Sequence, residues 1–200
     1  MKLPHSATSP FVRKVRVCAI ELGLDNKIDR QPTDASDPAG DLGKRNPLDK
    51  VPSLQLDDGS ALYDSPVICE YLDSLAGNKL HPTSGPARWT ALRRQALADG
   101  IMDAGVLVRG ESLRPAGEQS PGFIAKQKGK MAQALDALEG EADKLGEGLD
   151  IGLIAIASAL GYVDFRFSAD NWRAKRPKLA RWYDRFAQRP SMQATAPKDA

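Results

Sequence analysis

Residues 51–65 read Val-Pro-Ser-Leu-Gln-Leu-Asp-Asp-Gly-Ser-Ala-Leu-Tyr-Asp-Ser, and this stretch decides the fold that we expect. Two short apolar segments flank Asp58-Gly59, and an Asp-Gly pair in that setting is a strong signal for a β-hairpin. Ser65 and Pro66 then start a helix that we expect to reach about Ala76, because proline is favoured in the first helical turn. The stretch therefore predicts two antiparallel strands followed directly by a helix.

The residues before this hairpin alternate between strand and helix signals. Residues 1–6 and 28–31 are predicted to form short strands. Residues 10–22 carry apolar side chains at helical spacing, and Gly23 is placed to end that helix. Residues 32–47 are rich in Pro, Gly and Asp and are predicted to form a loop. The expected order for the first part of the chain is β-α-β-loop-β-β-α.

The chain after residue 76 has only helical signals. Residues 77–86 are predicted to form a linker, and apolar spacing indicates long helices around 89–107 and 124–145. Residues 151–163 are apolar nearly all round, which predicts a helix buried at the centre of its domain. Residues 179–186 are typical of a last amphipathic helix. The second part is therefore expected to be all-helical.

Composition excludes several classes of protein. The chain has 200 residues, of which 42% are hydrophobic and 27% are charged, and these values exclude disordered, collagen and coiled-coil proteins. A net charge of +2 lacks the strong basic excess of a nucleic-acid-binding protein. The longest apolar run, residues 151–160, is too short to span a bilayer, and the first residues lack the apolar core of a signal peptide. We expect a cytoplasmic protein with no nucleic-acid or membrane partner.

The sequence has two cysteines, Cys18 and Cys69, and no Cys-x-x-Cys motif, so no zinc site or disulfide framework is expected. Both lie on apolar helical faces, and we expect both in the core. No metal is expected. The prolines mark helix starts, because each of five follows a residue at which a helix is predicted to begin. These five are Pro10, Pro66, Pro86, Pro121 and Pro177.

Two of these helix starts carry serine, Ser9 before Pro10 and Ser65 before Pro66, and they flank Val51-Pro52 in the first part of the chain. A helix N-terminus has a partial positive charge and free N–H donors, so it is suited to an anion. Two such ends beside an open backbone edge would suit a small ligand with several negative charges. The alternative is that the serines only cap their helices, which is the more frequent reason for a serine at this position.

The chain resembles the cytosolic glutathione S-transferases, of the type with serine at the catalytic position. Five stretches carry the resemblance, spread in the expected order along the chain. They are residues 9–15 (Ser-Pro-Phe-Val-Arg-Lys-Val), 46–54, 63–73, 159–167 and 189–192. The resemblance implies an α/β thioredoxin-like N-terminal domain (1–76), a linker (77–86) and an all-α C-terminal domain (87–200). It also implies a homodimer.

By this resemblance Ser9 is the catalytic residue, which hydrogen-bonds the sulfur of glutathione from the start of the first helix. A thiol with a pKa near 8.5 is mostly protonated at neutral pH, and the thiolate is the nucleophile. Lowering that pKa by about two units requires ~2.7 kcal/mol, which is within reach of one hydrogen bond to the sulfur anion together with the helix end.

The resemblance also assigns residues that bind the glutathione backbone. Val51 would pair its backbone with the cysteinyl residue of glutathione, beside a cis bond to Pro52. A cis bond has a low cost only before proline. Ser65 would bind the α-carboxylate of the γ-glutamyl end, and Asp64 would pair with the α-ammonium group. Asp64 is one methylene shorter than the residue often found at that position.

Further positions complete the predicted site. Lys50 matches a basic residue that reaches the glycyl carboxylate, and a solvated lysine is the alternative explanation. Phe11 is predicted to border the bound glutathione and the pocket for the second substrate. On the long helix, Met102, Val106 and Arg109 are expected to line that acceptor pocket.

Two features depart from the family pattern or lie outside it. Pro4 and His5 fall in the first strand, which should be internal to the sheet. Proline removes a hydrogen-bond donor, so we expect this strand to be short or irregular. His5 is more simply explained by packing or solvation than by a role in the site. The charges of Arg13, Lys14 and Arg16 are expected to line a solvated helix face.

The function that these observations favour is a glutathione transferase for detoxification, in which glutathione attacks an electrophilic small molecule or reduces a peroxide. Serine cannot form a mixed disulfide with glutathione, so thiol-transfer chemistry is disfavoured. The alternative is a binding or regulatory protein that has the glutathione S-transferase fold without catalysis. A thioredoxin-like redox protein is disfavoured because the sequence has no Cys-x-x-Cys motif.

Overall fold

The structure is a computed structural model that describes residues 1–33 and 42–198. Packing divides it into two units, each described here by itself. One is the sheet unit, Met1–Trp89 together with Pro190–Ala200, and the other is the helical unit, Thr90–Arg189. The elements of the sheet unit, with the start of α4, are β1 (Lys2–His5), α1 (Pro10–Glu21), β2 (Asp29–Pro32), α2 (Leu42–Arg45), β3 (Leu54–Gln55), β4 (Ala61–Leu62), α3 (Ser65–Leu75) and α9 (Pro190–Ala194). Those of the helical unit are the rest of α4 (Gly85–Ser112), α5 (Pro121–Glu141), α6 (Ile151–Arg166), α7 (Trp172–Lys175) and α8 (Pro177–Phe186).

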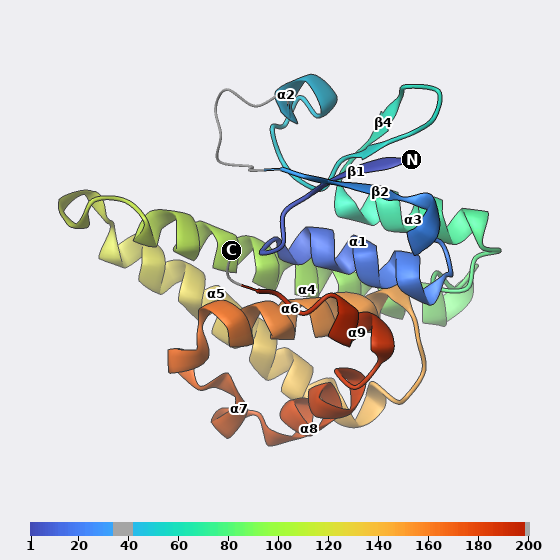
Figure 1. Cartoon of the computed structure of the whole chain (residues 1–200). Coiled ribbons are helices and arrows are strands. Elements are labelled where there is room, and N and C mark those ends of the chain that lie inside the picture. The colour runs from blue at the N-terminus through green and yellow to red at the C-terminus, as the bar shows by residue number, and fades with distance from the viewer. Residues whose placement is uncertain (34–41, 199–200) are drawn as a thin grey trace. The chain divides into compact units, whose positions relative to one another are not determined.

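The sheet has four strands in the order β2-β1-β3-β4 (Figure 1). β2 is parallel to β1, whereas β3 and β4 are antiparallel to their neighbours. The predicted hairpin is confirmed: Leu54 pairs with Leu62, and Gly59 in the turn has a φ of +88° that suits glycine. β1 is internal and short, as predicted, and its ladder with β3 is limited to Lys2 opposite Gln55. Pro4 therefore lies beyond the part of β1 that pairs with β3, and its missing N–H removes no hydrogen bond from that ladder.

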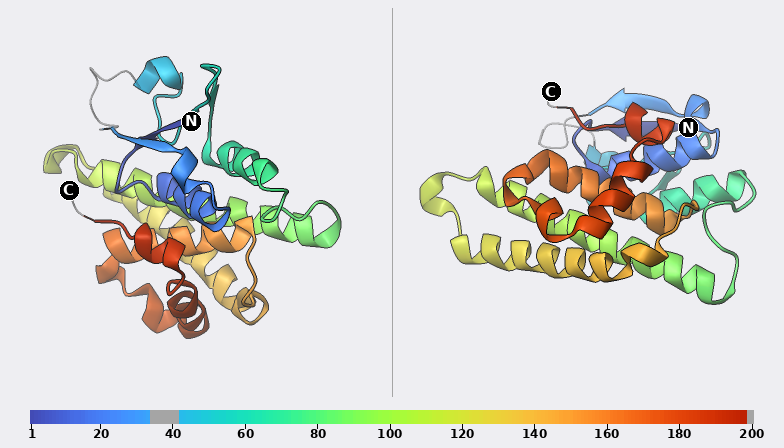
Figure 2. Two further views of the ribbon diagram at one scale, coloured as in Figure 1. Left: turned by 45° about the vertical axis from the view of Figure 1, so that its right-hand side comes forward. Right: turned by 90° about the horizontal axis from the view of Figure 1, so that it is seen from below.

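Helix α1 is covered from two sides within the sheet unit. It packs on α3 and on α9, and α9 lies along it although it comes from the far end of the chain (Figures 1 and 2). The cysteines Cys18 on α1 and Cys69 on α3 are fully buried, which confirms that both belong to the core. Burial raises the pKa of the Cys18 thiol well above its usual value, so this thiol stays protonated at neutral pH.

The predicted loop over residues 32–47 is wrong for its last part. Residues 42–45 form the short helix α2, and residues 34–41 lie outside the described part of the chain. The local reason is that Leu42 is buried and its carbonyl accepts a hydrogen bond from the N–H of Asn46 at 2.8 Å. The single buried leucine anchors one helical turn that a count of turn-forming residues does not reveal.

The prolines lie at helix starts as predicted, but the serines do not all serve the same purpose. Ser9 and Ser120 each cap a helix by accepting a backbone N–H. Ser65 is instead the first residue of α3, and Asp64 occupies the N-cap position without a side-chain cap bond. The alternative explanation that Ser65 only caps its helix is therefore wrong, because α3 begins at Ser65 itself, one residue earlier than a helix capped by Ser65 would begin.

The centre of the helical unit is α6, in which every residue from Ile151 to Val163 is buried, as predicted. Asp150 caps it by accepting the N–H of Leu153 at 2.8 Å. Gly152 permits a close approach of two helices, because a Cβ at this position would lie 2.6 Å from the carbonyl oxygen of Ala91 on α4. Within the described residues, no single helix is long and apolar enough to cross a membrane, and only the bent pair 151–166 and 168–175 meets that length and composition together.

Candidate functional site

The sheet topology brings the predicted glutathione-binding segments to one edge. β1 ends toward Ser9, and β3 runs antiparallel beside it, so the residues just before β3 lie at the edge where β1 ends. β4 is antiparallel to β3, so the residues just after β4 return to the same edge. Ser9, Val51-Pro52 and Asp64-Ser65 are the segments at these three positions. These segments lie far apart in sequence, and the directions of β1, β3 and β4 bring them to the same end of the sheet.

Ser9 is the N-cap of α1. Its Oγ accepts the N–H of Val12 at 3.3 Å, and its carbonyl accepts the N–H of Arg13 at 3.0 Å. The alternative explanation that Ser9 caps its helix is thus confirmed. It uses the hydroxyl oxygen only as an acceptor, so the O–H remains able to donate to an anion placed at the helix end.

The segment before β3 presents an open backbone edge. The Val51-Pro52 bond is cis, as expected from the resemblance. Within the described residues, the N–H and C=O of Val51 make no hydrogen bond. The buried Asn46 holds this segment by donating to the carbonyl of Lys50 at 2.8 Å. The Lys50 side chain itself is exposed. A peptide-like ligand would find here one free donor and one free acceptor in strand-like spacing.

The start of α3 places a carboxylate beside free backbone donors. Asp64 is exposed, and its carboxylate makes no hydrogen bond to the described residues, while its carbonyl accepts the N–H of Ile68 at 3.1 Å. Ser65 is 1% exposed at the first helical position. The peptide bond between Tyr63 and Asp64 is also cis. This arrangement offers an anion for an ammonium group and N–H donors for a carboxylate, two groups that an α-amino acid end carries together.

The residues predicted for the acceptor pocket fall in both units. Phe11 is half-buried on α1, and the Lys14 ammonium lies 6.0 Å from the centre of its ring. Met102, Val106 and Arg109 lie on α4 in the helical unit. Met102 is fully buried, whereas Val106 is 42% exposed and Arg109 is exposed. Their part in an acceptor pocket stays a prediction.

The charges of α1 differ from expectation. The prediction that they line a solvated face is wrong for Arg13 and Lys14, which are 8% and 0% exposed, because α3 and α9 both cover α1. Arg16 is half-exposed, and its guanidinium lies 3.4 Å from His5 Nε2. Burial, followed by the positive charges of Arg16 and Arg30, lowers the pKa of His5, which keeps its ring neutral at physiological pH.

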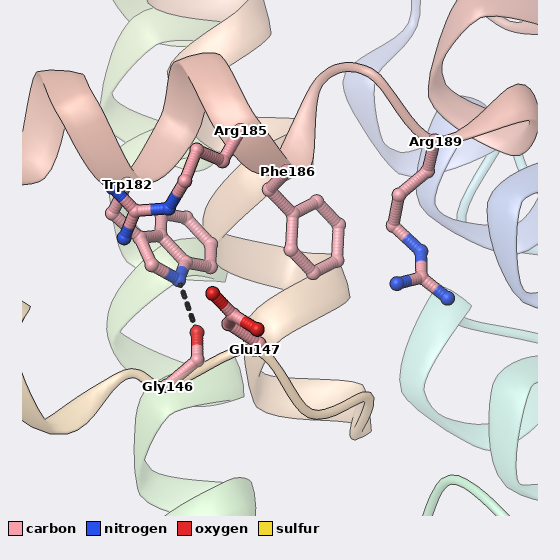
Figure 3. A pocket seen from close by; sticks show the side chains of 6 residues that line it. All are labelled: Gly146, Glu147, Trp182, Arg185, Phe186 and Arg189. Atoms are coloured by element: carbon pink, nitrogen blue, oxygen red, sulfur yellow. Dashed lines mark hydrogen bonds between the residues drawn. The ribbon is translucent and has the colours of Figure 1, made fainter.

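A separate pocket lies in the helical unit and shares no residue with the predicted site (Figure 3). Its volume is about 260 Å³, and it is lined by Gly146, Glu147, Trp182, Arg185, Phe186 and Arg189. The Trp182 indole donates to the carbonyl of Gly146 at 3.0 Å, and the Arg189 guanidinium lies 5.4 Å from the centre of the Phe186 ring. Two of its polar side chains, those of Trp182 and Arg189, are thus already engaged. In the described part of the chain, no group of three or more His, Cys, Asp or Glu side chains is placed to hold a metal ion.

Comparison with known proteins gives one consistent family. The model of the glutathione S-transferase N-terminal domain matches residues 8–75, and that of the glutathione S-transferase C-terminal domain matches residues 116–185. The "uncharacterized GST-like protein YibF" of Escherichia coli K12 is 36% identical over the whole of both chains.

Two solved structures from Pseudomonas fluorescens Pf-5 are also similar. One is a glutathione transferase family member with bound glutathione, 46% identical over 99% of each chain with a TM-score of 0.95. The other has bound S-(propanoic acid)-glutathione and is 45% identical over 100% of each chain with a TM-score of 0.91. Both ligands contain the tripeptide whose backbone the predicted edge would hold.

Proposed function

The chain belongs to the glutathione S-transferase family, and on that premise we propose that it is a glutathione transferase in which Ser9 activates the thiol. The observation that carries the proposal is the position of Ser9 at the N-cap of α1, at the same end of the sheet as the Val51 backbone, which has no hydrogen bond to the described residues. A peptide bound along that edge would direct its central residue toward the start of α1. The glutathione bound to the similar protein of Pseudomonas fluorescens supports such a ligand.

The proposed mechanism begins with binding of the tripeptide at both ends. Val51 pairs with the cysteinyl backbone, while Asp64 and Ser65 take the ammonium and carboxylate of the γ-glutamyl end. Lys50 is available to the glycyl carboxylate. The Ser9 O–H then donates to the sulfur, and the helix N-terminus adds its partial positive charge, so the thiol loses its proton to water near neutral pH.

The thiolate attacks an electrophilic carbon, a carbon–sulfur bond forms, and the leaving group departs with the bonding electron pair. The same activation step serves attack on an activated double bond, where the adduct takes up one proton from water. It also serves attack on a peroxide oxygen, where the O–O bond breaks, the alkoxide or hydroxide leaves, and the sulfenic acid formed is reduced by a second glutathione to the disulfide and water. The glutathione S-conjugate bound to the second Pseudomonas fluorescens structure supports transfer to a small electrophile. We propose further that the protein works in the cytoplasm as a homodimer, in detoxification, and that Phe11, Met102, Val106 and Arg109 contact the electrophile.

The test compares wild type with Ser9→Ala in turnover of glutathione with a chloronitrobenzene. Loss of a hydrogen bond to a charged sulfur predicts a fall of roughly 10- to 100-fold in kcat/KM. Ser120→Ala is the matched control, because Ser120 also precedes a proline and also caps its helix with a 3.3 Å bond. Both variants lose a cap and should lose similar stability, but only Ser9→Ala should lose activity.

Equal rates for wild type and Ser9→Ala would show that Ser9 is not the activating group. Calorimetric titration with glutathione separates the second candidate function. Binding of glutathione without turnover of any electrophile or peroxide would indicate a carrier or regulatory protein with this fold. Absence of glutathione binding would overturn the transferase and favour an interaction protein with this fold.

A further inference from the structure

Arg13 is a buried cation whose described hydrogen-bond acceptors are all uncharged. It is 8% exposed, and its guanidinium donates to the carbonyl of Met192 at 3.2 Å and to the hydroxyl of Thr195 at 3.5 Å. Among the residues that the structure describes, its Nη1 has no partner and no carboxylate forms an ion pair with it. Both acceptors are neutral. Burial of a charge with only neutral partners costs free energy of folding. A functional role for the Arg13 charge would explain why the protein keeps it.

The partners of Arg13 belong to residues 190–195, which we call the C-terminal strap. Thr195 donates its hydroxyl to the carbonyl of Ser191 at 2.8 Å, and Ser191 donates its own to the Glu21 carboxylate at 2.5 Å. The two strap hydroxyls are buried, at 1% and 4% exposure of their residues. The strap is therefore fixed along α1 at two points, near the last turn and near the first (Figures 1 and 2).

The point at which Thr195 contacts Arg13 lies one helical turn from Ser9. The N–H of Arg13 donates to the carbonyl of Ser9 at 3.0 Å, so the two residues are i and i+4 on the same helix face. Their separation along the axis is about 6 Å, and helical side chains lean toward the N-terminus, which is the Ser9 end. The strap thus fixes the side chain of a cation whose backbone lies one helical turn from the N-cap Ser9.

We propose that Arg13 is a positioning residue for the glutathione thiolate, held by the C-terminal strap so that its charge stabilises the anion at Ser9. This inference rests on the proposed function and adds to it the regulation of thiol acidity by the end of the chain. The other charged groups named on these elements are the cations Lys14 and Arg16 on α1, Glu21, which is engaged by Ser191, and Asp73 on α3, which is engaged by backbone N–H groups. The sequence of α9 contains no charged residue.

The experiment measures the pKa of enzyme-bound glutathione from the ultraviolet absorbance of its thiolate in a pH titration. For Arg13→Gln we expect this pKa to rise by about one unit, which is a tenfold loss of thiolate below the pKa. Arg16→Gln is the matched control, because it removes a cation that is half-exposed and two turns from Ser9. Its expected shift is below about 0.3 unit, because distance and solvent weaken the interaction.

A second variant covers the case in which Arg13→Gln does not fold. Thr195→Val keeps the shape and the Arg13 charge but removes one of its two acceptors, and we expect a rise of about 0.3 unit in the thiol pKa with glutathione still bound. An unchanged thiol pKa in the folded Arg13 variant, or in Thr195→Val if the first is insoluble, would overturn the inference and leave the role of Ser9 intact. A wild-type enzyme whose bound thiol has the pKa of free glutathione would instead refute the proposed function itself.

Discussion

The buried carboxylate of Asp73 holds the connection between α3 and α4, and its replacement has a large predicted cost. Asp73 is 0% exposed and accepts four hydrogen bonds. Three come from the backbone N–H groups of Lys79, Leu80 and His81 at 2.7, 2.9 and 2.7 Å. The fourth comes from the His81 ring at 2.9 Å. One side chain thus satisfies three consecutive backbone donors and a buried imidazole.

Asp73→Ala would leave these donors without an acceptor. Breaking a buried charged network costs about 3–5 kcal/mol, which for a chain of this size lowers Tm by roughly 10 °C. Glu70→Ala is the matched control on the same helix. Glu70 forms its 3.1 Å ion pair with Arg88 at the surface, where Glu70 is 56% exposed, so its loss should cost less than about 1 kcal/mol. Urea denaturation followed by circular dichroism gives both values. A cost for Asp73→Ala no larger than for Glu70→Ala would refute this reasoning.

The same carboxylate has a predicted pH signature. Burial alone raises the pKa of Asp73, but the hydrogen bonds from Leu80, His81 and Lys79 outweigh it and lower the pKa below its usual 3.8. A lowered folded-state pKa contributes stability above the unfolded pKa, and this stability is lost as the pH falls through the folded value. The difference in unfolding free energy between wild type and Asp73→Asn should therefore be constant near neutral pH and shrink below about pH 4. A difference that does not change on acidification would contradict this.

Two further predictions concern Gly152 and His5. Gly152→Ala should cost about 1–3 kcal/mol in urea denaturation, because its Cβ would lie 2.6 Å from the Ala91 carbonyl oxygen, whereas Gly129→Ala, with no atom within 4 Å, should stabilise by roughly 0.5–1 kcal/mol. Equal effects would contradict the close approach of the two helices. The pKa of His5, followed by NMR, should lie below 6.5, and Arg16→Gln should raise it only partly because burial is the larger cause. A full return to 6.5 in that variant would show that charge, not burial, dominates.

Much of the fold could be predicted because its signals are local. The Asp58-Gly59 turn, the proline at each helix start and the apolar run of α6 each act within a few residues, and each is confirmed. Asp64, and not Ser65, is the N-cap residue of α3, so the helix begins at Ser65. The Ser-Pro pattern alone does not decide between these two helix starts. Helix α2 was missed because one buried leucine outweighs a segment rich in turn-forming residues.

The candidate site could be predicted only through the family resemblance. No local signal places Ser9, Val51 and Ser65 together, since their proximity follows from the direction of β1, β3 and β4. The family resemblance assigned roles to the residues at those positions. The strand order of the sheet explains why they lie at the same end of it. Asn46, which fixes the backbone before Val51, belongs to a matching stretch but shows its purpose only in the 2.8 Å bond to the Lys50 carbonyl.

The burial of Arg13 shows most clearly what helical spacing of residue types cannot predict. Its spacing on α1 and its charge are those of a solvated helix face, and the residues that bury it lie about 180 positions later, as in its contact with Thr195. Because α9 packs in the sheet unit, residues 190–195 cover the helix that begins after Ser9. A charge that is buried by such a distant segment cannot be recognised from its own neighbours. It follows that the acidity of a thiol bound at Ser9 should respond to substitutions in residues 190–195, which no motif of the glutathione-binding segments would identify.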